Sequence, residues 1–244
     1  MLRRFVLALI LSLLATGIAR AEARTYCAPD AANLVVYVDK TTPYDETDKR
    51  ALIDGIGRLF ESLVGGERFS LRTIAESFSA STSLLDACLP WCPAAGLFDS
   101  LFGSCNEGLV ANDRKALRTR LVGQLRDLLD NFVELPNSEI VRTIATTLPV
   151  ELRQGRPNHV YMFTDLIENS TYLPGKDFFG KKTPVLFARV AADGLVPSLT
   201  GVDVHVFGVG RGGNPADRHP LDQALLEKLT GFWTGYFAAA GASL

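Results

Sequence analysis

The chain has 244 residues, of which 47% are hydrophobic and 21% are charged, and its formal net charge is -2 at pH 7. This length and hydrophobic content fit a single domain with a substantial core. The mildly acidic balance argues against nucleic acid as the main partner, because phosphate binding needs a clustered cationic surface.

The first 23 residues have the pattern of a secretory signal peptide. Two arginines precede an apolar run over residues 5–18, and small-x-small cleavage candidates lie between residues 19 and 23. The run is shorter than the roughly 20 residues of a membrane span, which leaves an uncleaved anchor only as the alternative. We therefore expect an exported chain, periplasmic or secreted, with no stable membrane anchor and a single mature domain over residues 24–244.

The first part of that domain alternates strand and helix patterns. Residues 33–38 are a short apolar run typical of a buried parallel strand, and residues 68–74 are expected to form the next parallel strand. Between them, the apolar residues over 45–63 recur at helical spacing. Residues 79–87 are expected to return as an antiparallel strand at the edge of the sheet.

Four cysteines remain after export: Cys27, Cys88, Cys92 and Cys105. In an oxidising compartment an even count predicts disulfides, here two bonds with three possible pairings. The spacing of Cys88 and Cys92 is not that of a redox motif, and without a nearby histidine it makes a poor zinc site. Chain tracing puts the cysteine-containing insert, around residues 86–106, at the pole of the sheet where the parallel strands begin.

The second part of the chain continues the alternation. A helix with an apolar face over residues 117–132 leads to Ser138 and to another helix from about residue 140. Two further strands and a final helix are expected over residues 159–164, 203–210 and 225–237. Lysines 176, 181 and 182 are expected in a solvated loop. Together these elements predict an α/β fold with a Rossmann-like open, mostly parallel sheet, helices on both faces and one antiparallel edge strand.

Two of the predicted strands end on an aspartate. Asp39 and Thr41 follow the first strand, and Asp165 follows the strand over residues 159–164. Because open α/β sheets bind ligands at the carboxyl ends of their strands, both carboxylates are expected at one pole. Carboxylate and hydroxyl oxygens suit hard divalent cations. The alternative is that both aspartates cap the helices that follow their strands.

These segments resemble the von Willebrand factor A (vWA) family, whose divalent-metal site combines a strand-end Asp-x-Ser-x-Ser, a later Thr or Ser loop, and an Asp that closes another strand. The resemblance covers roughly residues 33–240. It implies a metal site formed by Asp39, Thr41, Ser138 and Asp165. The second hydroxyl of the family motif is replaced by Pro43, which has no side-chain donor or acceptor. Either water or Thr42 supplies that oxygen, or the site binds metal weakly or not at all. Ser138 also fits an ordinary helix N-cap.

The resemblance implies a protein-binding module rather than an enzyme. A divalent cation, Mg²⁺, Ca²⁺ or Mn²⁺, would keep one coordination position open, and an acidic residue of a protein partner would complete it. One alternative is a metal-free structural adaptor of the same fold. Another is a magnesium-dependent phosphotransferase resembling the haloacid dehalogenase family, which also starts with Asp at a strand end. That family needs a second Asp where this chain has Thr41, so the general acid is absent.

Overall fold

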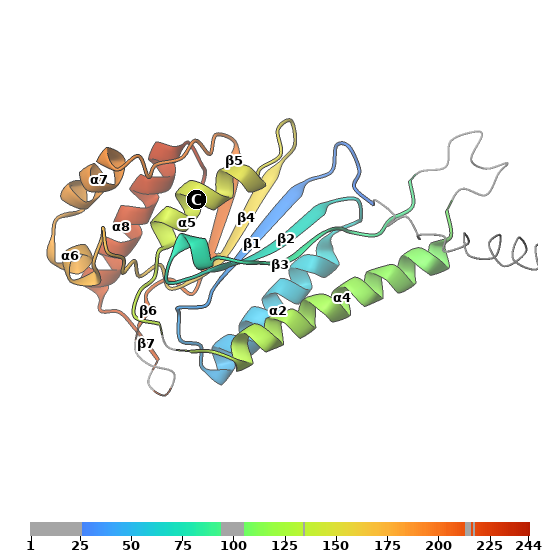
Figure 1. The fold of residues 1–244 in the computed structure, drawn as a ribbon, viewed down its shortest axis with the longest axis horizontal. Helices are drawn as coiled ribbons and strands as arrows, with labels where there is room; N and C mark the ends of the chain where they lie inside the picture. The colour runs from blue at the N-terminus through green and yellow to red at the C-terminus, as the bar shows by residue number, and fades with distance from the viewer. Residues whose placement is uncertain (1–25, 94–104, 134, 213–215, 217) are drawn as a thin grey trace, which may run out of the picture.

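A five-stranded sheet in the order β3-β2-β1-β4-β5 forms the centre of the molecule (Figure 1). The computed structural model describes residues 26–93, 105–133, 135–212, 216 and 218–244. The sheet strands are β1 (Asn33–Asp39), β2 (Arg68–Ile74), β3 (Ser83–Cys88), β4 (Asn158–Phe163) and β5 (Val202–Phe207). β3 pairs antiparallel with β2, and the other neighbours are parallel. The predicted signal peptide and part of the predicted insert lie outside the described residues.

β1 occupies the middle of the sheet, and its position explains its uninterrupted apolar sequence. Every residue of the strand is buried. Val35 and Tyr37 pack into one core cluster, whereas Leu34, Val36 and Val38 belong to the cluster on the opposite face. A strand that is covered on both faces has no solvent-facing side, so apolar residues follow one another without alternation.

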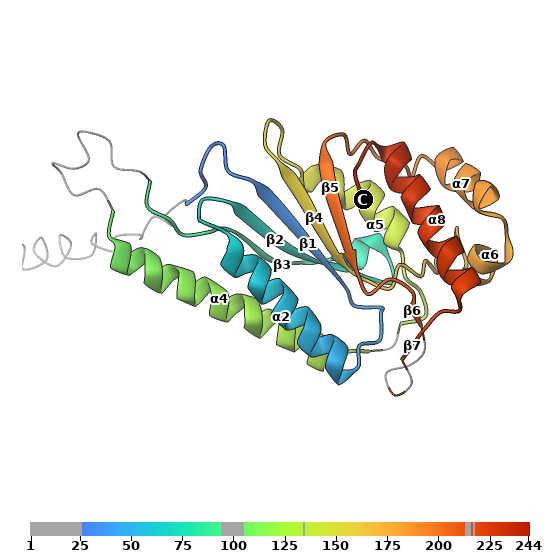
Figure 2. The same cartoon turned by 180° about the vertical axis from the view of Figure 1, so that it is seen from behind.

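Helices cover both faces of the sheet, as Figures 1 and 2 show. One face carries α2 (Glu46–Ser62) and α4 (Glu107–Asp130), and the other carries α5 (Ile140–Glu151), α6 (Gly175–Gly180), α7 (Thr183–Ala192) and α8 (Gln223–Ala240). A short helical turn, η1 (Phe78–Ala80), precedes β3, and β6 (Arg211–Gly212) and β7 (His219–Pro220) form a separate antiparallel pair. The predicted α/β fold, with a mostly parallel sheet and an antiparallel edge strand, is confirmed.

Two local predictions need correction. Of the three lysines expected in a loop, Lys176 lies in the short helix α6, whereas Lys181 and Lys182 form the link between α6 and α7. Lys181 also pairs with an aspartate one turn earlier at 2.8 Å, which stabilises the end of α6. The long helix α4 ends at Asp130, so Phe132 does not extend its apolar face.

Disulfides hold the pole at which the parallel strands begin. Cys27 bonds to Cys88, and Cys92 bonds to Cys105. Cys88 lies opposite Arg68 in the β2–β3 pair, next to the start of β2. The expected two disulfides are confirmed, and the first lies at the pole opposite the carboxyl ends of the parallel strands.

Candidate functional site

The ends of β1 and β4 bring both predicted aspartates to one pole of the sheet. The register pairs Val38 with Phe163, so Asp39 and Thr164 are neighbours just past those residues. Thr164 Oγ1 donates a hydrogen bond to Asp39 Oδ2 at 2.7 Å. Asp39 is fully buried, and Asp165, which follows Thr164, is 8% exposed.

Thr41 and Ser138 add hydroxyl groups to this cluster. Asp39 Oδ1 accepts hydrogen bonds from the Thr41 amide at 2.9 Å and from the Thr41 hydroxyl at 2.6 Å. Thr41 Oγ1 also lies 2.8 Å from Ser138 Oγ. The Thr41 hydroxyl is oriented to donate to both Asp39 and Ser138, so these two acceptors share its single hydrogen. Three of the four predicted site residues are thus joined by direct hydrogen bonds.

Ser138 does not cap the helix that follows it. The N-cap of α5 is Glu139, whose side chain forms no capping bond. Glu168 instead accepts hydrogen bonds from the Ile140 and Val141 amides, at 2.8 and 2.9 Å. The side chain of Ser138 therefore faces the aspartate cluster, and the N-cap alternative is wrong for this residue.

The turn after β4 fixes Asp165. Asp165 Oδ1 accepts from the Ile167 amide at 2.9 Å, and the Asp165 carbonyl accepts from the Gly210 amide at 2.9 Å. Leu166, the residue between Asp165 and Ile167, has φ 61°. This left-handed conformation costs a residue with a side chain about 1–3 kcal/mol. The Trp233 indole holds this turn by donating to the Leu166 carbonyl at 2.9 Å. Backbone strain is thus maintained directly beside a candidate ligand.

Neither strand-end aspartate caps a helix. The N-cap of α2 is Asp45, whose Oδ1 accepts from the Thr47 and Asp48 amides, both at 2.8 Å. After Asp165, the next helix is α6, and its N-cap is Pro174. The helix-cap alternative for the two aspartates is therefore wrong.

Burial dominates the electrostatics of the pair. It raises the pKa of Asp39, and hydrogen bonds from Thr41 and Thr164 offset part of that rise. Burial, followed by the charge of Asp39, also raises the pKa of Asp165. The Thr42 hydroxyl lowers the pKa of both carboxyl groups. The same hydroxyl accepts a hydrogen bond from the Asp165 amide at 3.4 Å, so Thr42 lies beside the carboxyl pair.

The pair lacks a dedicated cationic side chain. Arg218 lowers the pKa of Asp165, but its guanidinium pairs with Asp48 at 3.3 Å. In the part of the chain that the structure describes, no Lys or Arg forms an ion pair with Asp39 or Asp165. A buried carboxylate without a partner is costly, so the pole favours a proton or a bound cation.

The donor set fits a hard divalent cation. Among the described residues, no group of three or more His, Cys, Asp or Glu side chains could hold a metal ion. A cation at this pole would therefore rest on two carboxylates, hydroxyl oxygens and water. Magnesium is often held in this way, by one or two carboxylates with several retained waters.

Thr164, which bonds to Asp39, and Glu168, in the loop after Asp165, were absent from the sequence-based site. Thr164 had a signal, because it directly precedes Asp165 and one strand register brings it beside Asp39. No sequence signal marked Glu168, because its partners Ile140 and Val141 lie 28 and 27 positions away in the chain. Only the folded chain reveals that contact.

Glu168 makes the stability depend on pH. Burial raises its pKa from 4.5 to about 7, so the folded state holds the proton more tightly than the unfolded state. Its contribution to the free energy of unfolding should therefore fall by about 3 kcal/mol as pH rises through this window. Glu168→Gln keeps an acceptor oxygen for the α5 amides and removes the charge. We expect this component to disappear in urea unfolding measured from pH 4 to pH 8.

The control for that measurement is Glu227→Gln, since Glu227 is an exposed residue of α8. It should follow the wild-type pH profile. The interpretation of Glu168 would be wrong if Glu168→Gln kept the wild-type slope.

Comparison with known proteins gives structural neighbours of low sequence identity. No protein family model and no curated protein match the sequence. Among solved structures, proximal thread matrix protein 1 from the mussel byssus is 12% identical with a TM-score of 0.41, covering 89% of this chain and 49% of that chain. The human COPII-coat protein Sec24c is 11% identical with a TM-score of 0.35, covering 90% of this chain and 33% of that chain. This chain thus spans at most about half the length of either protein.

Proposed function

We propose that this chain is an exported, vWA-like protein-binding module. Its cluster of Asp39, Thr41, Ser138 and Asp165 would hold a divalent cation, and an acidic residue of a protein partner would complete the coordination. The observation that carries the proposal is the burial of two carboxyl groups at one pole, beside hydroxyls and without an ion-paired Lys or Arg among the described residues. A cation would compensate both charges and use the oxygens that surround them.

The cysteines support a proposal about the compartment. Two disulfides are typical of proteins in an oxidising environment. We propose the periplasm or the cell exterior as that environment. Within the described residues, no helix combines the length and the apolar character of a membrane span.

A metal-free adaptor of the same fold is the second candidate. The hydrogen bonding of Asp39 favours it, because both carboxylate oxygens of this residue already accept hydrogen bonds from threonines. In that case the partner would bind the same pole directly, and one carboxyl group would carry a proton in place of the cation.

Calorimetric titration of the mature chain with Mg²⁺, Ca²⁺ and Mn²⁺ separates the two candidates. We expect saturable binding of one cation per chain. At about 100 times the Kd, the cation should raise the free energy of unfolding by about 2.7 kcal/mol. A chain that shows neither a binding isotherm nor a shift in unfolding with any of the three cations would support the metal-free adaptor.

Pro43→Ser should tighten cation binding, because it restores the hydroxyl that the family motif has at this position. One additional hydrogen-bonding oxygen contributes about 1 kcal/mol, which corresponds to roughly a fivefold lower Kd. Pro43→Ala is the matched control, since it releases the fixed φ of proline without adding an oxygen. Equal affinities for the Ser and Ala variants would contradict a ligand position at residue 43.

A further inference from the structure

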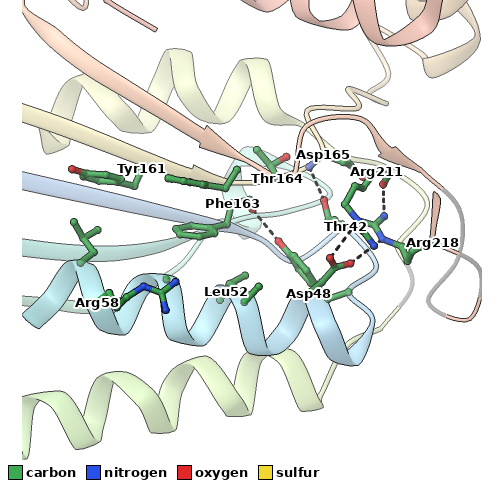
Figure 3. A pocket seen from close by; sticks show the side chains of 16 residues that line it. Thr42, Asp48, Leu52, Arg58, Tyr161, Phe163, Thr164, Asp165, Arg211 and Arg218 are labelled. Carbon is green, nitrogen blue, oxygen red and sulfur yellow. Dashed lines mark hydrogen bonds and ion pairs between the residues drawn. The ribbon is translucent and has the colours of Figure 1, made fainter. Parts of the chain in front are cut away.

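A pocket of about 440 Å³ opens beside the candidate cation site, between α2 and the β4–β5 part of the sheet (Figure 3). Leu52 of α2 and Phe163 of β4 line its middle, and Thr42 and Asp165 line the end at the strand termini. Small-molecule and side-chain sites in proteins typically enclose about 300–1,000 Å³. The pocket is therefore large enough for at least one bulky side chain of a partner.

The pocket exists because the helices leave part of the sheet uncovered. Tyr161 and Phe163 of β4 stack on His205 and Phe207 of β5, with ring centroids 4.9 and 5.0 Å apart. Phe207 keeps 48% of its surface exposed. Parallel sheets normally have both faces covered, so an aromatic surface left open beside α2 is suited to an apolar partner group.

Gly55 keeps the pocket open on the α2 side. A Cβ atom at Gly55 would lie 3.6 Å from the Phe163 ring, which is an ordinary contact distance. A larger side chain there would therefore enter the pocket without straining the helix backbone. A Cβ at Gly57, on the same helix, would meet no atom within 4 Å. These two glycines allow a matched pair of substitutions.

The charges at the two ends of the pocket favour an acidic occupant. At the strand termini, Asp165 faces the pocket, and Arg218 pairs with Asp48. At the other end, Arg58 is exposed, and no ion pair involves it within the described residues. α2 rises about 15 Å between Asp48 and Arg58. With a cation bound at Asp165, both ends of the pocket would attract negative charge.

We infer that this pocket binds the segment of the partner that flanks its acidic residue. That segment is an extended acidic peptide, with a bulky aliphatic or aromatic side chain against Leu52 and Phe163 and a second acidic group at Arg58. About five extended residues cover 15 Å. The inference rests on the proposed function, because the first acidic residue is the one that completes the cation.

A library of short random peptides displayed on phage tests the inference. Selection is made on the mature chain in a mixture of Mg²⁺, Ca²⁺ and Mn²⁺. The selected peptides are expected to carry two acidic residues on either side of a bulky apolar residue. One selected peptide is then labelled with fluorescein, and its affinity is measured by anisotropy with and without EDTA.

Two pairs of variants locate the peptide. Gly55→Leu should fill the pocket and weaken binding by about tenfold or more, whereas Gly57→Leu should change it by less than about twofold. Arg58→Glu should weaken binding by about fivefold or more. The control is Arg126→Glu, because Arg126 is an exposed residue of α4 that does not line the pocket. Melting temperatures establish that each variant is folded. Should Gly55→Leu fail to fold, the affinity of the Arg58→Glu variant tests the pocket instead.

The outcomes distinguish this inference from the proposed function. Equal binding by the Gly55→Leu and Gly57→Leu variants, or selected peptides without acidic residues, would overturn the pocket even if EDTA abolished binding. If EDTA left the affinity unchanged while Gly55→Leu and Arg58→Glu weakened it, the peptide-binding pocket would be supported and the role of the cation would be contradicted.

Discussion

Asp165→Ala is expected to abolish cation binding while the fold survives. The substitution removes a formal ligand charge and a direct oxygen donor. Loss of a residue that merely supports a metal ligand costs about 10- to 100-fold in affinity, so the loss of a ligand should cost at least about 100-fold. Binding of a partner through the cation should disappear to the same extent. Calorimetric titration of the variant with Mg²⁺, Ca²⁺ and Mn²⁺ measures the change.

The free energy of unfolding of the Asp165→Ala variant should change much less than its cation affinity. Burial and the charge of Asp39 raise the pKa of Asp165, so its ionised form opposes folding at neutral pH. Removing it relieves that cost and offsets the loss of the hydrogen bond from Ile167. Asp54→Ala is the control, because Asp54 is an exposed carboxylate on α2. Unchanged partner affinity for Asp165→Ala, in cation and in chelator alike, would favour the metal-free adaptor.

Reduction of the disulfides is expected to cause the largest loss of stability. The bond from Cys27 to Cys88 joins residues 61 positions apart, and that from Cys92 to Cys105 joins residues 13 apart. Closing loops of these lengths in the unfolded chain contributes about 4 and about 3 kcal/mol. Urea unfolding with and without reductant should therefore differ by about 7 kcal/mol.

Cation affinity of the folded, reduced chain should remain that of the oxidised chain. The bond at Cys88 lies beside the start of β2, whereas the candidate ligands follow the carboxyl ends of β1 and β4. The double substitutions Cys27→Ala/Cys88→Ala and Cys92→Ala/Cys105→Ala separate the two contributions. Four free thiols in the chain recovered from the exporting compartment would show that the disulfides do not form in the cell.

The strands at the centre of the sheet were predictable from their composition. β1 is an apolar run without helical periodicity, and β2 has the bounds expected from the sequence. Strand polarity then required Asp39 and Asp165 to reach the same pole, because β1 and β4 are parallel. The position of Ser138 followed from the family resemblance, since a serine before a helix would otherwise be interpreted as a cap.

Long-range contacts account for what the sequence did not reveal. Glu168 caps α5 from the loop that follows β4, and no local pattern marks such a partner. The open face of β5 did have a signal. Asp203, His205 and Phe207 alternate with valines that are buried or half-buried, which is typical of a strand with one solvent-facing side. That side stays uncovered because of the way α2 packs on the sheet. Local sequence does not specify this packing.

Crystals of the mature chain grown with Mn²⁺ would test the cation site most directly, through an anomalous difference map. The proposal predicts one strong peak among the oxygens of Asp39, Thr41, Ser138 and Asp165, bound directly or through water. Saturating Mn²⁺ with no peak at this pole, and with the Thr41 and Thr164 hydrogen bonds to Asp39 intact, would contradict it.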